Sequence, residues 1–350
     1  MSADPVLAIL RGPQGWLPAG DTRWEEAARR AVADHLAGAV LTRLDQTGRR
    51  EEVPGAALRT LESDLTRVRV AQTLLFGRFA ELAGCLRAAG VPFIVHKGGA
   101  LAATVYARAE DRPMVDIDVI VRPRDWRPVR EALTAAGYRM PGAEGESFWR
   151  ENYFNVPIMT AGPSPAHFDL HWGLAQEGRY HVDTAGLFER AVPYAWGDGA
   201  LLRLGDEDLL LSLFLHLAYH YFEARLLWLY DMKRVIESWR PDWGAVLDRA
   251  SSWGLRTVVS FNLAYLDKVF PGTVPCEAAR AGRAGWLRRT AVRPLLSRHP
   301  RRLFRGEGRR AVQLYLGMAG IDWPADMALF AAGKMARGIR WAGRHPGHRH

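Results

Sequence analysis

Residues 91–121 change the periodicity of the chain twice, and this stretch constrains the fold more than any other. An apolar run, VPFIV, is followed by the glycine pair Gly98-Gly99 and then by the short helical pattern ALAATVYA. A second apolar run, DIDVIV, completes the stretch. Short β-branched runs predict buried strands, and a glycine pair after a strand predicts a tight turn. We therefore expect two buried strands joined through a short helix.

Helical periodicity lies on both sides of this stretch. After an irregular lead-in over residues 1–20, we expect one helix over residues 24–44 and a longer one over residues 57–89. Beyond residue 204 the spacing of apolar residues becomes helical again. The helices expected there cover residues 206–220, 224–239, 243–253, 257–270, 309–316 and 325–341.

The middle of the chain also contains weaker strand and helix patterns. Pro123 is expected to open a helix that ends before Gly137, and the segments YFNVPIMT and AHFDLHW are expected to be strands. Strands that alternate with helices predict a small mixed sheet. We therefore predict an α+β protein with an N-terminal helical region (1–90), an α/β core (91–204) and a C-terminal helical domain (205–350).

Two carboxylates in DIDVIV are placed to work together. Side chains two residues apart in a strand point the same way, so Asp116 and Asp118 lie side by side while Ile117 and Val119 face the core. Two close carboxylates repel each other unless a cation lies between them, and Mg²⁺ prefers such oxygen ligands. The pair therefore predicts a metal site at the rim of the strand; an exposed pair of strand-end aspartates is the alternative.

The diglycine and a third carboxylate extend this pattern. Gly98 and Gly99 lie between a strand and a helix, where free backbone N–H groups suit a phosphate, although a plain turn is the alternative. No G-x-G-x-x-G or GxxxxGK[ST] motif is present. Asp169 lies in AHFDLHW, and it would reach the same metal ions if this strand pairs beside DIDVIV. Phosphoryl chemistry with two metal ions needs bridging carboxylates and a base, and Asp169 would serve as that base or as a ligand.

The glycine pair, the D-h-D strand (h is hydrophobic) and the later aspartate resemble the nucleotidyltransferase fold of the DNA polymerase β superfamily. More narrowly, HKGGALAATVY, DRPMVDIDVIV and FDLHW resemble a bacterial family labelled uncharacterised nucleotidyltransferase. The helical stretch LLLSLFLHLAYHYFEARLLWLYD also resembles the C-terminal part of that family, and the likeness covers about residues 60–240. The spacer before Asp116 is longer than is usual in the superfamily and Gly99 replaces a serine; the narrower family shares both features.

The resemblance implies transfer of a nucleoside monophosphate group from a nucleoside triphosphate (NTP), with Mg²⁺ or Mn²⁺, to an acceptor hydroxyl on a small molecule, peptide or protein. Gly98 and Gly99 would hold the phosphates, and the catalytic residues Asp116, Asp118 and Asp169 would bind the metal. Two alternatives remain: a transferase on the same fold that moves a phosphate or sugar-phosphate group, and a non-catalytic nucleotide- or RNA-binding regulator that uses the arginine-rich residues 280–310.

Three further polar residues near these motifs are candidates for nucleotide binding. Lys97 would meet the β- and γ-phosphates as a point charge. Arg112 would clamp a phosphate or the acceptor, or else pair with Glu110 or Asp111. His171 shares a strand face with Asp169, so it would orient that carboxylate or bind the acceptor, with a packed strand histidine as the alternative.

The helical part contributes a second group of candidates. His216 and His220 lie four residues apart on one helix face, a spacing that suits a metal, but hydrogen-bonded core residues are the more common reading. Their better role is to line a nucleotide cleft together with Asp231. Aromatic residues that would stack on a base, or simply fill the core, are Trp149, Tyr153, Trp172, Tyr219 and Tyr221.

Composition narrows the class of protein further. The net charge of +9 suits polyanionic partners, but a solvated positive surface is the preferred explanation and nucleic acid is not favoured. No apolar run is long enough to span a membrane. The start lacks a basic signal-peptide region, and the two cysteines, Cys85 and Cys276, suit buried reduced thiols. We therefore expect a cytoplasmic protein.

Overall fold

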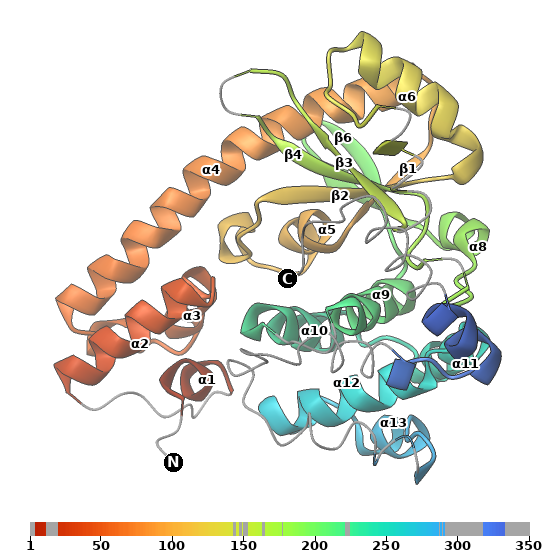
Figure 1. Cartoon of the computed structure of the whole chain (residues 1–350). Helices are drawn as coiled ribbons and strands as arrows, with labels where there is room; N and C mark the ends of the chain where they lie inside the picture. Colours follow the sequence, from red (N-terminus) through yellow and green to blue (C-terminus); the bar gives the residue numbers. More distant parts are fainter. Residues whose placement is uncertain are drawn as a thin grey trace, which may run out of the picture.

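A six-stranded mixed sheet forms the centre of the computed structural model (Figure 1). The model describes residues 4–11, 20–142, 145–146, 149, 153–162, 165–176, 178–220, 225–286, 288, 290 and 318–332. The strand order is β3-β4-β2-β1-β6-β5, and helices flank the sheet, so the predicted α+β class is confirmed. The strands are β1 (Phe93–His96), β2 (Asp116–Val121), β3 (Asn155–Met159), β4 (His167–His171), β5 (Val192–Trp196) and β6 (Gly199–Arg203).

The four strands that the sequence predicts occupy one half of the sheet. β2 lies in the middle of that half, antiparallel to β1 and parallel to β4, and β3 closes the edge. Both β1 and β2 are buried along nearly their whole length, as their β-branched composition requires. The hairpin of β5 and β6 was not anticipated, because its half-exposed strands carry no clear alternation of apolar and polar residues.

The N-terminal helices are α1 (Pro5–Leu10), α2 (Asp21–Ala33), α3 (Ala37–Gln46) and α4 (Gly55–Ala88). The expected single helix over residues 24–44 is wrong: the chain breaks between α2 and α3, where His35 adopts a left-handed backbone with φ of 60°. Apolar spacing continues across this break, so periodicity alone could not locate it. The expected irregular lead-in is also wrong at residues 5–10, where Asp4 caps α1 by accepting the N–H groups of Val6 and Leu7.

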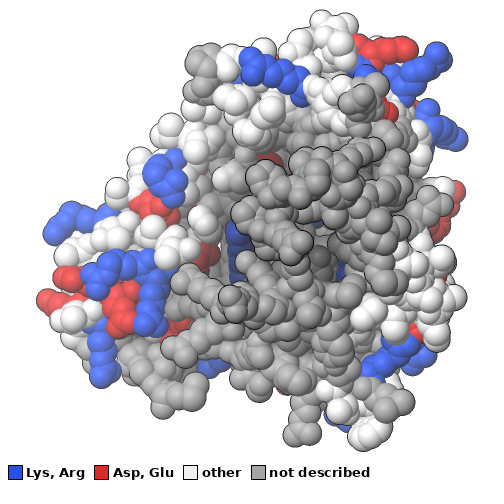
Figure 2. Space-filling view, viewed as in Figure 1, with Lys and Arg blue, Asp and Glu red and all other residues white. Residues whose placement is uncertain are grey.

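Helix α4 joins the N-terminal helices to the sheet. Its first half packs against α2 and α3, and its second half runs along the sheet (Figure 1). There the ring of Phe79 lies 6.3 Å from Phe168 of β4 and 5.5 Å from Trp196 of β5. Over the N-terminal helices, basic and acidic side chains are interspersed and many are paired (Figure 2), so the net positive charge is not concentrated there.

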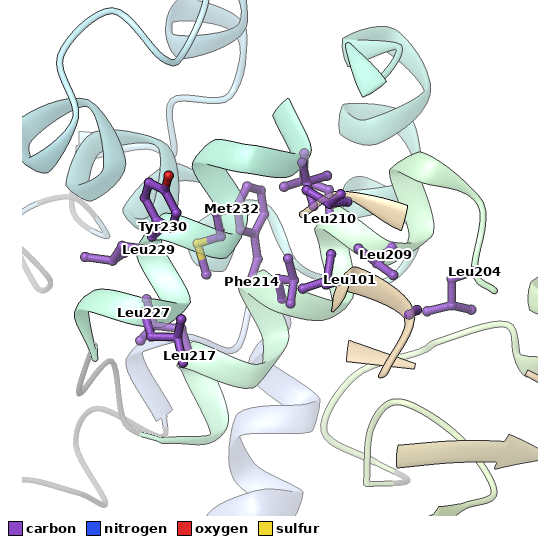
Figure 3. Packing of buried hydrophobic residues seen from close by; sticks show 14 of the residues in the cluster. Leu101, Leu204, Leu209, Leu210, Phe214, Leu217, Leu227, Leu229, Tyr230 and Met232 are labelled. Atoms are coloured by element: carbon purple, nitrogen blue, oxygen red, sulfur yellow. The ribbon is translucent and has the colours of Figure 1, made fainter. Parts of the chain in front are cut away.

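The C-terminal part is a group of helices that packs beneath the sheet through α5 (Lys97–Thr104). Leu101 of α5 lies among Leu210 and Phe214 of α9 and Met232 of α10 (Figure 3). None of the described helices combines the length and apolar character needed to cross a bilayer. The remaining helices are α6 (Trp126–Ala135), α8 (Thr184–Glu189), α9 (Asp206–Tyr219), α10 (Leu226–Trp239), α11 (Trp243–Ser252), α12 (Arg256–Val269) and α13 (Cys276–Ala281).

Most expected C-terminal helices are present within a few residues of their predicted ends. The helix expected over residues 309–316 and most of the one over residues 325–341 lie outside the described residues, as do most of residues 280–310 on which the RNA-binding alternative depends. Cys276 is exposed, so the expectation that both cysteines are buried is wrong. The division into three domains stays a prediction, since one hydrophobic core runs from Val6 to Phe330.

Gly38 marks the closest approach of the N-terminal helices to the core. A Cβ atom on Gly38 would lie 2.7 Å from the Cα of Asp111, whereas one on Gly77 of α4 would meet nothing within 4 Å. We predict that Gly38→Ala lowers the free energy of unfolding by about 1–3 kcal/mol through overpacking. Gly77→Ala should raise it by about 0.5–1 kcal/mol through helix propensity. Chemical denaturation followed by circular dichroism measures both, and equal effects would contradict the tight contact.

Candidate functional site

The register between β2 and β4 brings the predicted acidic residues together. The two strands are parallel, and Asp118 stands directly opposite Asp169. The expectation that AHFDLHW pairs beside DIDVIV is therefore confirmed. Because same-face side chains of paired strands are neighbours, both carboxylates project from one face of the sheet, with Asp116 two residues before Asp118 on that face.

These residues form a group whose spacing fits a divalent cation. Asp118, Asp169 and His171 each offer a ligand atom, and the three atoms lie within 4.8 Å of one another. Carboxylate and imidazole donors at this spacing match the ligand sets of divalent metals. It is the one such group found in the described part of the chain. Asp116 adjoins it, since burial and then the charges of Asp118 and Asp169 raise the pKa of Asp116 to about 6.

Asp118 is the most heavily contacted of the three carboxylates. Its Oδ1 accepts hydrogen bonds from Lys97 Nζ at 2.7 Å and lies 2.8 Å from His171 Nε2. Burial alone would raise the pKa of Asp118, but Lys97 and His171 lower it well below its usual range. Lys97 therefore lies against the acidic residues of the candidate site. His171 contacts Asp118 and not Asp169, whose Oδ2 accepts a hydrogen bond from Asn155 at 3.0 Å.

The diglycine lies inside the first turn of α5, not in a turn before it. The change of direction falls one residue earlier, where Lys97 has a left-handed backbone with φ of 45°. A Cβ on Gly98 would lie 2.6 Å from Nη1 of Arg112, and one on Gly99 would lie 3.0 Å from both Ile117 and Val95. The glycines thus let α5 pack closely on the sheet and beside Arg112. The N-terminal end of this helix, with its unsatisfied N–H groups, lies next to the carboxylates.

Arg112 is paired with a residue that sequence reasoning did not connect to it. Its Nη2 donates to Oδ2 of Asp231 in α10 at 2.8 Å, and its Nε lies 3.2 Å from both carboxylate oxygens. Tyr106 donates its hydroxyl to the same carboxylate at 2.7 Å. Glu110 and Asp111, the partners considered from sequence, bond to other arginines. Arg112 and Asp231 are both buried, so their pair joins the turn before β2 to the C-terminal helices.

Three rings of the C-terminal helical part pack against one another. The rings of His216 and His220 lie 4.6 Å apart, and Trp228 of α10 lies 4.4 and 4.7 Å from them. Burial, and next the positive charge of Lys97, lower the pKa of both histidines. Trp228 was not considered from sequence, because a tryptophan at helical spacing usually fills the core.

Two further residues of the site were missed from sequence. His96 ends β1 directly before Lys97; its ring is buried 5.9 Å from that of His171 and its Nδ1 has no hydrogen-bond partner. Phe154 lies 5.6 Å from His171 and 4.7 Å from Tyr219. Adjacency to KGG was the only available signal for His96. Of the other expected stacking residues, Trp149 packs on Tyr153 and Trp172 on Trp126, and Tyr221 lies outside the described residues.

The fold and the site together define a protein with a mixed sheet whose adjacent strands present aspartates to a helix N-terminus, an arrangement suited to a metal ion and an anionic ligand. The family model described as uncharacterised nucleotidyltransferase matches residues 20–271, and the chain belongs to this family. The match includes every candidate site residue. Comparison with proteins of curated function and with solved structures gave no match.

The Arg112–Asp231 pair should contribute strongly to stability. Asp231→Ala leaves the buried guanidinium of Arg112 without its carboxylate, so we predict a loss of about 3–5 kcal/mol in the free energy of unfolding. Glu131→Ala is a control on α6, where the side chain of Glu131 is 69% exposed and pairs at 4.0 Å with Arg127, which is 88% exposed; it should cost less than about 1 kcal/mol. Equal losses in urea titrations of the two variants would contradict the assignment.

The raised pKa of Asp116 predicts a pH-dependent stability in metal-free protein. The pKa of Asp116 is about 6 in the folded chain, against an ordinary value of 3.8 for an aspartate. Between these two pH values the folded chain therefore binds more protons at Asp116 than the unfolded chain does. The free energy of unfolding therefore falls as pH rises towards 6 and stays lowered above it. With a chelator present, Asp116→Asn should be more stable than wild type by about 1–3 kcal/mol at neutral pH, and the gain should vanish near pH 4. A melting-temperature difference that is the same at both pH values would contradict this.

Proposed function

We propose that the protein transfers a nucleoside monophosphate group from an NTP to an acceptor hydroxyl on a small molecule, peptide or protein, with Mg²⁺ or Mn²⁺ as cofactor. The observation that carries the proposal is the direct pairing of Asp118 with Asp169 beside the N-terminus of α5. Membership of a nucleotidyltransferase family supports it.

In this proposal the three aspartates share the cation, and Asp169 also acts as the base. Asp116, Asp118 and Asp169 would hold the divalent cation, which when bound would neutralise charge on the phosphates and favour displacement of pyrophosphate. Burial, and next the charge of Asp118, raise the pKa of Asp169, which suits a carboxylate that accepts a proton from the acceptor hydroxyl. Asn155 holds Oδ2 of Asp169, and His171 holds Oδ1 of Asp118, so both carboxylates have fixed orientations.

The positive groups would bind the triphosphate. The backbone N–H groups at Gly98 and Gly99 lie at the start of α5, where the helix dipole favours an anion. Lys97 now neutralises Asp118, and we propose that it turns to the β- and γ-phosphates once a cation takes that role. The Nε–Nη2 edge of Arg112 already binds Asp231, and Nη1 donates one hydrogen bond to the carbonyl of Pro113. We therefore assign Arg112 a single hydrogen bond to the ligand through the second N–H of Nη1, or an effect through its charge alone, in place of a bidentate clamp.

The proposed chemistry is tested with NTPs labelled at different phosphates. We predict that an α-labelled NTP with Mg²⁺ labels an acceptor from a cell extract or the protein itself, whereas a γ-labelled NTP does not. Asp118→Asn should lower the rate by about 10²–10³-fold or more, because it removes charge where the transition state needs it. Asp248→Asn, an exposed aspartate on α11, is the control and should leave the rate unchanged.

The two labels also separate the proposal from its alternative. Transfer of the γ-label alone would replace nucleotide transfer by phosphate transfer on the same site. Label transfer that Asp118→Asn leaves at the wild-type rate would overturn the assignment of the site.

A further inference from the structure

Three aromatic rings form a cluster where α9 ends and α10 begins. His216 and His220 face each other one helical turn apart, and Trp228 packs against both at ring separations of 4.4 and 4.7 Å. His220 is the most exposed of the three residues, although its ring is packed against the other two, and His216 and Trp228 are partly buried. Arg225 lies 5.2 Å from the Trp228 ring. We refer to His216, His220 and Trp228 as the ring cluster.

A chain of contacts joins the end of α9 to the acidic site. Tyr219, in the same turn of α9, lies 4.7 Å from Phe154, which lies 5.6 Å from His171. His171 in turn contacts Asp118 at 2.8 Å. Helix α5 also packs directly against α9, where Leu101 lies beside Phe214 (Figure 3).

Helix α5 begins at Lys97 and packs against α9, which carries His216. The charge of Lys97 also lowers the pKa of both His216 and His220. In the proposed reaction the triphosphate lies at Lys97, so the ring cluster borders the proposed triphosphate position.

The chemistry of the ring cluster suits a planar, uncharged group. Burial and Lys97 lower the pKa of both histidines, so at neutral pH the cluster presents two neutral imidazoles and an indole. Neutral rings do not attract a phosphate, but each offers a π-face on which a base can stack. A nucleobase is planar and uncharged, and in an NTP it is attached to the triphosphate that we place at Lys97.

We propose that the ring cluster is the nucleobase subsite, a proposal that rests on the function proposed above. The strength of stacking depends on the area of the ring and not on the hydrogen-bonding groups at its edge. The subsite therefore accepts any base and favours the larger purines over pyrimidines. The substrate class is thus a nucleoside triphosphate with a broad base preference, ATP and GTP above CTP and UTP.

The test compares a nucleotide with the same phosphate chain lacking a base. Isothermal titration calorimetry, with Mg²⁺ present, measures Kd for ATP, CTP and inorganic tripolyphosphate. We expect wild type to bind ATP about tenfold more tightly than tripolyphosphate and a few fold more tightly than CTP. Trp228→Leu should raise the Kd for ATP about tenfold and leave the Kd for tripolyphosphate unchanged. Trp228→Phe should retain most of the affinity for ATP.

Matched controls make the result decisive. Trp286→Leu removes a tryptophan that is 68% exposed and outside the site, and it should bind all three ligands as wild type does. If Trp228→Leu fails to fold, His220→Ala, at an exposed position, carries the same expectation. Equal wild-type affinity for ATP and tripolyphosphate would overturn the subsite and leave the proposed function standing. Absence of binding to both would overturn the proposed function, and the subsite with it.

Discussion

The parallel pairing of β2 with β4 is the constraint on which the rest of the site depends. It places Asp118 opposite Asp169, although 50 intervening residues include a helix and another strand. A shift of one residue would turn either carboxylate towards the core, where burial of an unpaired charge costs several kcal/mol. The buried apolar residues between the aspartates, such as Ile117 and Phe168, therefore fix the chemistry as well as the core.

The contacts around this pair are arranged to tolerate concentrated negative charge. Lys97 and His171 share one oxygen of Asp118, and Asn155 holds one oxygen of Asp169. Behind the site, Asp231 and Tyr106 hold Arg112 beside Gly98. The second arrangement connects a residue of α10 to the turn before β2, so the helical region contributes to the surroundings of the site through a buried ion pair. A partner 119 residues away in the chain explains why Asp231 can be buried.

The sequence predicted the parts of this structure that follow from local periodicity. Short β-branched runs located β1 and β2, and alternation in AHFDLHW placed Asp169 on a shared face. Backbone changes made by residues other than glycine could not be predicted, because His35 and Lys97 adopt left-handed conformations that their identities do not signal. The Arg112–Asp231 pair and the contact between Trp228 and the histidines depend on tertiary packing between distant helices, which no local pattern records. The sequence singled out the diglycine as a turn, but its role in the close packing of α5 on the sheet is visible only in the structure.

The central claim is that Asp118 and Asp169 hold one divalent cation between them. Anomalous scattering from crystals soaked in Mn²⁺ tests it most directly, because the metal position appears independently of catalytic activity. We expect a peak within coordination distance of both carboxylates, about 2.0–2.3 Å from their oxygens, with Lys97 Nζ displaced from Asp118. A Mn²⁺ peak elsewhere, with Lys97 still bonded to Asp118 at saturating metal, would contradict the account.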